Sequence, residues 1–185
     1  MLSFYSTLFL GVIAAFVGAY LQRKLWRHKT IEEIRQRETT EAKQLVSSIA
    51  RSLDRRLNEH RYFMSRIQRK VADKNDYEKY LSESRIWMES YSTYKTGIYH
   101  LFGNSAMLEF ENNIAGELIM NGRIVVRAFN IEYNRLNERG RKEQDEVFTR
   151  MSFISYLGAK YINHLNERIA NNEIGQISQH NNINS

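Results

Sequence analysis

The stretch VSSIARSLDRRLNEHRYFMSRIQRKV, residues 46–71, decides the fold class. Its mainly apolar residues recur at alternating intervals of three and four, which places them on one face of an α-helix, here called the seam. These positions are Val46, Ile49, Leu53, Leu57, His60, Met64, Ile67 and Val71. Because such a face packs against other helices, the stretch predicts one helix of a bundle.

The same periodicity continues on both sides of this stretch, with no alternating strand pattern. A capping box at Thr30 and Glu33 predicts that the helix runs over about 30–72. Asn75 and Glu78 could form a second capping box, at the start of the next helix. Further helices are expected at about 76–102, 105–138 and 141–170, with breaks at Gly103 and Gly140 and a possible interruption at Asn121-Gly122. The sequence therefore predicts an all-α bundle of about four helices.

Each downstream helix has its own apolar or aromatic stripe. The expected stripe positions are Tyr80, Ser84, Trp87, Tyr91, Tyr94, Ile98 and Leu101; Phe110, Ile114, Leu118, Val125 and Phe129; and Val147, Met151, Ile154, Leu157, Tyr161 and Leu165. The aromatic members could stack on nucleic-acid bases, but helical spacing favours a core role. Arg51, Arg55, Arg66, Arg69 and Lys70 could contact phosphates, although a solvated basic face is the favoured interpretation.

The chain begins with an uncharged segment, Leu2–Leu21. As a helix it rises roughly 30 Å, about the thickness of a hydrocarbon core. Tyr5 and Tyr20 lie near its two ends and Trp26 lies just beyond it, as expected of aromatic residues at a membrane interface. A basic cluster follows the segment, and no charged side chain precedes it: Arg23, Lys24, Arg27 and Lys29. This order favours an uncleaved single-pass anchor in a bacterial inner membrane, with the C-terminal part cytoplasmic. A cleaved signal peptide or a buried core helix is the alternative.

Within this segment, Gly11, Ala14, Ala15 and Gly18 recur at helical spacing and form one small-residue face. Small residues allow close approach of helices in lipid, where little hydrophobic drive exists between them. The face favours a homo-oligomer, although Gly and Ala are also simply common in membrane helices. Three regions follow: an anchor with its basic flank at 1–29, a cytoplasmic bundle at 30–171 and a disordered polar tail at 172–185.

Composition limits the chemistry. The chain has no cysteine, which excludes disulfides, thiolate metal sites and cysteine nucleophiles. Its net charge of +6 is compatible with an anionic membrane face or a nucleic acid. Phosphate-loop, zinc-protease and serine-hydrolase motifs are absent, and the five histidines show no metal-ligand spacing. We therefore expect no metal and no small-molecule cofactor.

One pattern could carry chemistry: Arg55 and His60 match Arg-x4-His, within the range typical of HEPN ribonucleases. There, histidine would move a proton and arginine would stabilise charge on the scissile phosphate. Five residues along a continuous helix place these side chains about 140° apart, whereas Arg56 lies one turn before His60. The alternative is that His60 is a structural polar residue in a packing seam or subunit interface.

The N-terminal membrane helix, the cysteine-free bundle and Arg55-x4-His60 together resemble the membrane accessory protein of type VI-B CRISPR systems. That resemblance implies an HEPN-like fold and a homo-oligomeric membrane pore that slows metabolism during phage infection. It also implies a CRISPR-associated RNase effector, or RNA, as partner, and little or no nuclease activity of its own. Three hypotheses remain: a membrane pore in antiphage defence, a membrane-tethered HEPN ribonuclease, and a non-enzymatic scaffold that recruits a soluble partner.

Overall fold

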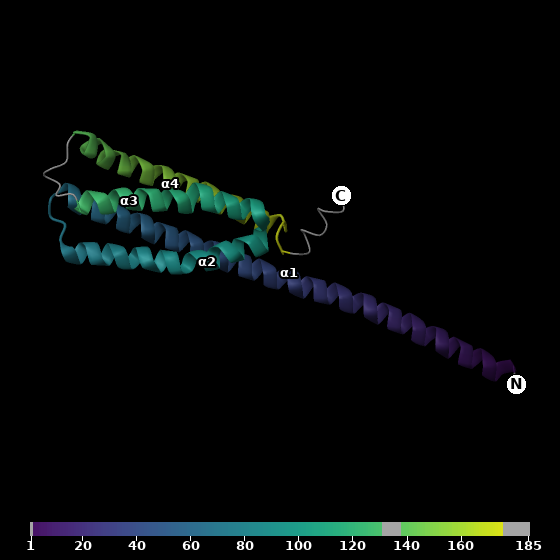
Figure 1. Cartoon of the computed structure of the whole chain (residues 1–185). Helices are drawn as coiled ribbons and strands as arrows, with labels where there is room; N and C mark the ends of the chain where they lie inside the picture. The colour runs from purple at the N-terminus through teal and green to yellow at the C-terminus, as the bar shows by residue number, and fades with distance from the viewer. Residues whose placement is uncertain (1, 131–137, 176–185) are drawn as a thin grey trace. The chain divides into compact units, whose positions relative to one another are not determined.

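The computed structural model describes the backbone of residues 2–130 and 138–175 and the side chains of residues 16–130 and 145–175. The helices are α1 (Leu2–Gln68), α2 (Lys74–Phe110), the π-helix η1 (Glu111–Ala115), α3 (Gly116–Asn130) and α4 (Glu138–Ala170). Figure 1 labels α1, α2, α3 and α4. No strand occurs in these described ranges, which confirms the predicted all-α class.

The chain divides into two compact units, Met1–Thr40 and Glu41–Ser185. The first unit is helical from Leu2, and large apolar side chains are exposed along it: Phe16, Val17, Tyr20, Leu21, Leu25 and Trp26. Within the part of the chain that the structure describes, no helix carries an apolar run of membrane-spanning length. The predicted span Leu2–Leu21 falls largely on residues 2–15, which lie outside the described side chains.

Most of the predicted small-residue face also lies outside the described side chains. Gly11, Ala14 and Ala15 lie outside the described side chains, and only Gly18 is covered. A methyl group added at Gly18 would meet no atom within 4 Å, so this position has room for a close neighbour. Association through this face stays a prediction.

The capping box predicted at Thr30 is wrong. Thr30 lies inside α1, and its hydroxyl donates to the carbonyl oxygen of Trp26 at 2.9 Å instead of capping a new helix. Residues 22–33 contain neither glycine nor proline, so no residue in this stretch forces the helix to stop.

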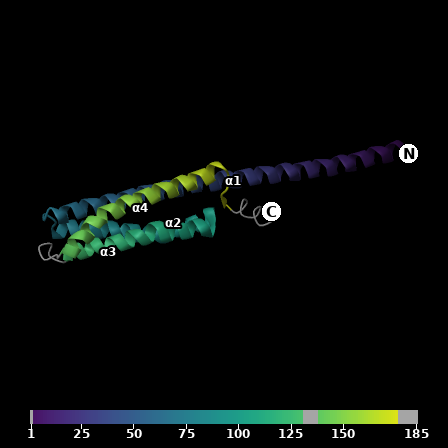
Figure 2. The same ribbon diagram turned by 90° about the horizontal axis from the view of Figure 1, so that it is seen from above.

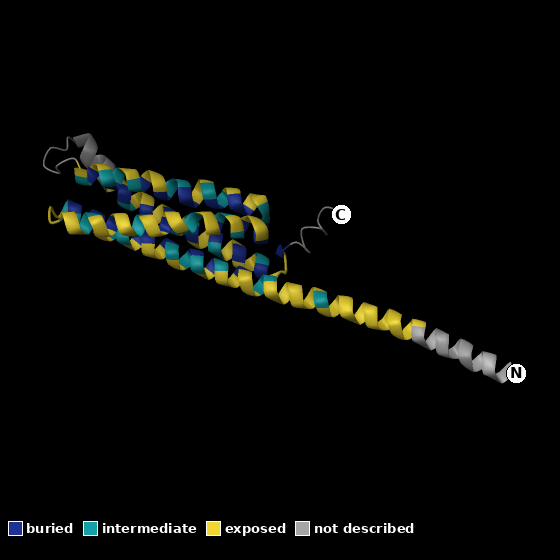
Figure 3. Cartoon of the chain, turned by 60° about the horizontal axis from the view of Figure 1, so that its bottom comes forward, coloured by how far each residue is buried: buried dark blue, intermediate teal, exposed yellow. Residues whose placement is uncertain are grey.

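The second unit is a bundle formed by α1 from Glu41 onward, α2, α3 and α4, which lie side by side in Figures 1 and 2. Buried positions recur along each helix with exposed positions between them, as Figure 3 shows. The predicted seam is confirmed, because its members from Val46 to Ile67 are all buried. Val71 is the exception: it lies past the end of α1 and is exposed.

The downstream stripes also form the core. Buried members are Tyr80, Trp87, Tyr94, Ile98, Leu101, Phe110, Ile114, Leu118, Val125, Val147, Met151, Ile154, Tyr161 and Leu165. Ser84, Tyr91, Phe129 and Leu157 are partly buried. Ring contacts link the stripes, such as Phe110 and Tyr161 with centroids 6.0 Å apart. The core interpretation of the aromatic stripe is therefore confirmed.

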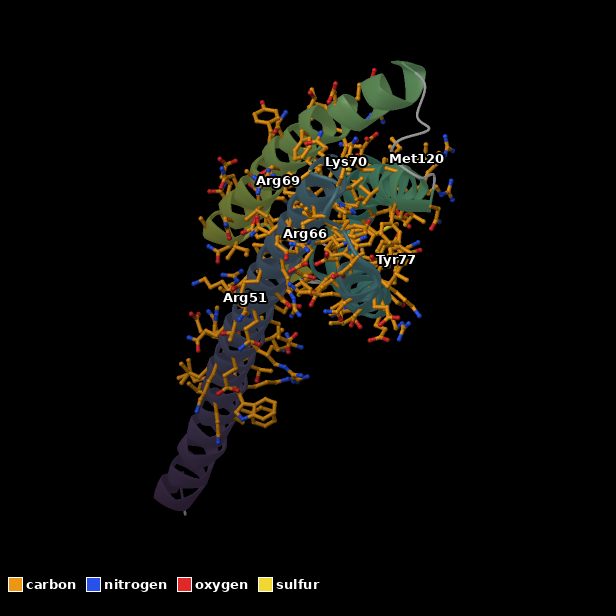
Figure 4. All side chains as sticks on the ribbon, turned by 90° about the vertical axis from the view of Figure 1, so that its left-hand side faces the viewer. Arg51, Arg66, Arg69, Lys70, Tyr77 and Met120 are labelled. Carbon is orange, nitrogen blue, oxygen red and sulfur yellow. The ribbon has the colours of Figure 1, made fainter. Side chains whose placement is uncertain are left out.

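The turn between α1 and α2 uses a different cap from the one predicted. Asp73, not Asn75, is the N-cap of α2: its side chain accepts from the backbone N–H of Asp76, whose carboxylate accepts from the backbone N–H of Asp73. Arg66 ties the two helices, donating to Asp76 at 2.5 Å and to the carbonyl of Val71 at 2.8 Å. Figure 4 shows Arg66, Arg69 and Lys70 around this end of α1.

The break at Gly103 is present, as a kink within α2. Its φ of 85° and ψ of 179° belong to a region that glycine alone occupies readily. The guanidinium of Arg168 on α4 donates to the carbonyl oxygen of Phe102 at 2.7 Å, next to this kink. The chain then continues through η1 into α3 without a loop.

The possible interruption at Asn121-Gly122 is wrong, because both residues are helical within α3. Asn121 is fully buried, and Gly122 lies against polar side chains of α1 and α2. Packing against these helices holds the segment helical despite the weak propensity of its residues. The irregular geometry instead occurs at η1, where the Glu111 carboxylate accepts from Tyr91 at 2.7 Å and from Lys95 at 2.6 Å.

Candidate functional site: a buried Arg-His-Tyr cluster and an adjoining cleft

Three polar side chains, Arg56, His60 and Tyr80, meet in the interior of the bundle. The Tyr80 hydroxyl lies 2.7 Å from Nε2 of His60 and 3.0 Å from Nη2 of Arg56. A guanidinium can only donate, so the tyrosine oxygen accepts from Arg56, and the proton of the hydroxyl is available for Nε2 of His60. We call these three residues the polar cluster.

The sequence places the cluster in a simple way. Arg56 and His60 are four residues apart on the inner face of α1, and Tyr80 lies on the second turn of α2. The Arg56 guanidinium also lies over the Tyr80 ring, 4.5 Å from its centroid. Charge over the ring face adds an attraction to the hydrogen bond.

Gly122 of α3 closes the cluster from a third helix. A Cβ built at Gly122 would lie 3.3 Å from the Tyr80 hydroxyl oxygen, 3.6 Å from Nε2 of His60 and 3.7 Å from Nη2 of Arg56. The absence of a side chain therefore lets α3 approach all three polar groups. This accounts for a glycine within a helix, where it otherwise costs roughly 1 kcal/mol relative to alanine.

Burial sets the ionisation of the cluster. Burial, with the positive charges of Arg56 and Arg61, lowers the pKa of the His60 imidazole from 6.5 to about 3. Burial also lowers the pKa of the Arg56 guanidinium and raises the pKa of the Tyr80 hydroxyl. At neutral pH the cluster therefore holds a neutral imidazole, a neutral phenol and one cation. Nδ1 of His60 has no hydrogen-bond partner among the described residues.

The two residues of the Arg-x4-His motif have different surroundings. Arg55 is exposed and bonds the Glu83 carboxylate of α2, which raises the pKa of its guanidinium. His60 is fully buried and bonds Tyr80. The residue that joins His60 at Tyr80 is Arg56, the neighbour that helical geometry favours. Among the described residues, the side chains of Arg55 and His60 therefore contact different partners and do not meet at a common site.

Proton transfer to an RNA substrate requires that the imidazole come within hydrogen-bond reach of the reacting oxygen. His60 has no exposed surface, and its pKa of about 3 lies far from neutral pH. The arrangement thus fits the structural alternative for His60, which holds α1 and α2 together through Tyr80.

Beside the polar cluster lies a cleft of about 560 Å³ between α2 and α3. Arg56 and Tyr80 line its inner part, and the α3 arginines Arg123 and Arg127 also line it. This cleft was not predicted from the sequence. The available signal was the run from Leu118 to Arg127, where apolar residues, a glycine and two arginines one turn apart share a short helix.

No family model, curated protein or solved structure matches this chain. The likeness to the CRISPR accessory family therefore stays a prediction. Among the described residues, no group of three histidine or acidic side chains is placed to hold a metal ion.

Proposed function

We propose that this chain is a membrane-anchored effector that assembles as a homo-oligomeric pore in RNA-guided antiphage defence and does not itself cleave RNA. The observation that carries the proposal is the uncharged segment Leu2–Leu21, followed within eight residues by Arg23, Lys24, Arg27 and Lys29. A lipid-spanning helix must be free of charge over about 20 residues, and the basic flank marks the side that stays in the cytoplasm.

The side chains at the end of this segment support an interfacial position. Tyr20 and Trp26 are 68% and 71% exposed. In the sequence they flank or adjoin the basic residues Arg23, Lys24 and Arg27. Amphipathic rings and long basic side chains are favoured at the boundary between lipid and water. Leu21 and Leu25 are exposed as well, so the apolar surface of this helix has few partners in the described chain.

Oligomerisation follows from the number of spans. A single helix cannot enclose a path for ions, so a pore built from this chain needs several copies. Gly11, Ala14, Ala15 and Gly18 supply a face on which such helices approach closely. Identical subunits close most simply into a ring with one repeated contact. Membrane lipid and further copies of this chain are therefore its first partners.

The place in antiphage defence rests on the resemblance to the accessory proteins of type VI-B CRISPR systems. It implies a CRISPR-associated RNase effector, or RNA, as a further partner of this chain. A scaffold that recruits a soluble partner through the bundle would use the same anchor and differs only in leaving the membrane sealed.

A membrane-tethered HEPN ribonuclease is the remaining alternative, and its support is the Arg55-x4-His60 spacing. The separate contacts of Arg55 and His60, to Glu83 and to Tyr80, favour the non-catalytic function. Metal-independent cleavage of RNA by the purified chain, lost in both Arg55→Ala and His60→Ala proteins that remain folded, would establish the ribonuclease instead.

Reporter fusions test the topology. A C-terminal fusion after Ser185 is expected to be active when the reporter works in the cytoplasm and inactive when it works only in the periplasm. The basic residues after the span set this orientation. The matched fusion carries the same reporter at the N-terminus, where the opposite pattern is expected. Periplasmic activity of the C-terminal fusion would contradict the proposed orientation.

A further inference from the structure

The α2–α3 cleft is lined by arginines, and no acidic side chain is among its described lining residues. Arg56 and Arg123 are the two arginines on which the inference rests. The carboxylates of Glu83 and Glu59 attract Arg56 electrostatically, but each forms its ion pair with another residue, Glu83 with Arg55 and Glu59 with Lys79 at 3.2 Å. No described carboxylate forms an ion pair with Arg56, although this residue is only 7% exposed.

A buried cation of this kind is costly unless an anion and hydrogen-bond acceptors compensate it. The hydrogen bonds of the Arg56 guanidinium go to the hydroxyl and carbonyl oxygens of Tyr80, the latter at a long 3.5 Å. Five N–H groups are available on a guanidinium, so two such bonds leave donors for a further acceptor. The indole N–H of Trp87, another lining residue, has no acceptor among the described residues.

Most of the remaining lining residues are apolar, and Ser84, Arg127 and Asn130 are the polar ones. Leu81, Met88 and Ile119 line the cleft and are 36%, 52% and 40% exposed, although nearby Trp87 and Leu118 belong to the core. The volume of about 560 Å³ lies within the range of about 300–1,000 Å³ that small-molecule sites occupy. A few convergent donors in an otherwise apolar cleft are typical of such sites.

We propose that the α2–α3 cleft binds an amphiphilic anion, a carboxylate or phosphate joined to a short apolar chain. The anionic group lies between Arg56 and Arg123, and the apolar chain lies along the aliphatic side chains of the cleft. This site is independent of the membrane anchor, because all its residues belong to the unit Glu41–Ser185.

Trp87 provides a direct readout. The chain has two tryptophans, so a Trp26→Phe background leaves Trp87 in the cleft as the only one. The full chain, in phosphatidylcholine nanodiscs or in plain buffer if it proves soluble, is titrated with octanoate, octanol and inorganic phosphate. Octanoate is expected to change Trp87 fluorescence saturably and to bind at least about tenfold more tightly than octanol, which lacks the charge-assisted bond. Phosphate alone is expected to bind more weakly than octanoate as well.

Two exposed arginines form a matched pair for the second part of the test. Arg123 lines the cleft, whereas Arg150 lies on α4 and does not. Arg123→Glu is expected to weaken octanoate binding at least about tenfold, and Arg150→Glu is expected to change it less than about twofold. Both replacements are on the surface, so both proteins should fold.

The outcomes separate clearly. Equal binding of octanoate and octanol, equal effects of the two arginine replacements, or no saturable change at Trp87 would each overturn the proposal. Repeating the titration in discs that contain phosphatidylglycerol identifies the source of the ligand. Weaker apparent octanoate binding there indicates that an anionic lipid competes for the cleft, and unchanged binding indicates a free organic acid.

Discussion

Replacing His60 with glutamine should make the bundle much less sensitive to acid. The His60 pKa is lowered from 6.5 to about 3 by burial and by the charges of Arg56 and Arg61, so the unfolded chain binds a proton in a pH range where the folded chain does not. Stability from this group is therefore fully present above pH 6.5 and is lost as the pH falls towards 3. Between pH 6 and pH 4 the wild type should lose roughly 2–3 kcal/mol through this group.

Glutamine is the matched replacement, because its amide can still hydrogen-bond to the Tyr80 hydroxyl but does not titrate. Urea unfolding followed by Trp87 fluorescence in the Trp26→Phe background measures the free energy of unfolding at each pH. His164→Gln, which replaces an exposed histidine of α4 3.7 Å from the Glu109 carboxylate, is the control for removing a histidine outside the core. Identical pH dependence of the wild type and His60→Gln would contradict the buried, neutral histidine.

On the proposed function, a single charge in the middle of the proposed anchor should release the protein from the membrane. Val12 lies near the centre of Leu2–Leu21, where an arginine costs about 2.5–3.5 kcal/mol on the insertion scale. That cost corresponds to roughly a hundredfold shift in the insertion equilibrium. Val12→Arg should therefore appear largely in the fraction that alkaline carbonate extracts from membranes, whereas the wild type should remain with the lipid.

Gln22→Arg provides the control for this experiment. It adds the same charge just beyond the uncharged segment, beside Arg23 and Lys24. Charge at this boundary lies in water or among lipid headgroups, so Gln22→Arg should stay membrane-bound. Extraction of the wild type itself by carbonate would show that residues 2–21 do not span the bilayer.

Helical periodicity was enough to predict the bundle. The seam from Val46 to Ile67 is buried as expected, since its residues lie on one side of a helix whatever the partner helices are. The break at Gly103 was also predicted from the sequence, because glycine commonly ends a helix. The structure places Gly103 at a φ of 85°, which glycine adopts readily.

Helix boundaries were harder to predict because each depends on a few local hydrogen bonds. Thr30 has the chemistry of a cap, but its hydroxyl bonds back to Trp26 inside a continuous helix. Asp73 and Asn75 are both suitable caps, and the ion pair of Arg66 with Asp76 accompanies the choice of Asp73. Which residue caps a helix therefore depends on where the preceding helix ends.

The site was only partly predictable, because it is formed by residues far apart in the sequence. Helical geometry correctly favoured Arg56 over Arg55 as the neighbour of His60. The contribution of Tyr80 and the approach of Gly122 depend on how α2 and α3 pack on α1. The spacing of Arg55 and His60 alone contains no information about those partners.

A path across the membrane, formed by several copies of this chain, is the core of the proposed function. Its sharpest test pairs the mass of the detergent-solubilised particle with the membrane potential of cells in which the protein is triggered. We expect a particle of several copies and a loss of potential, both weakened by Gly11→Leu while the helical content of the bundle is kept. A monodisperse monomer that leaves the potential unchanged under activating conditions would contradict the pore and leave the scaffold.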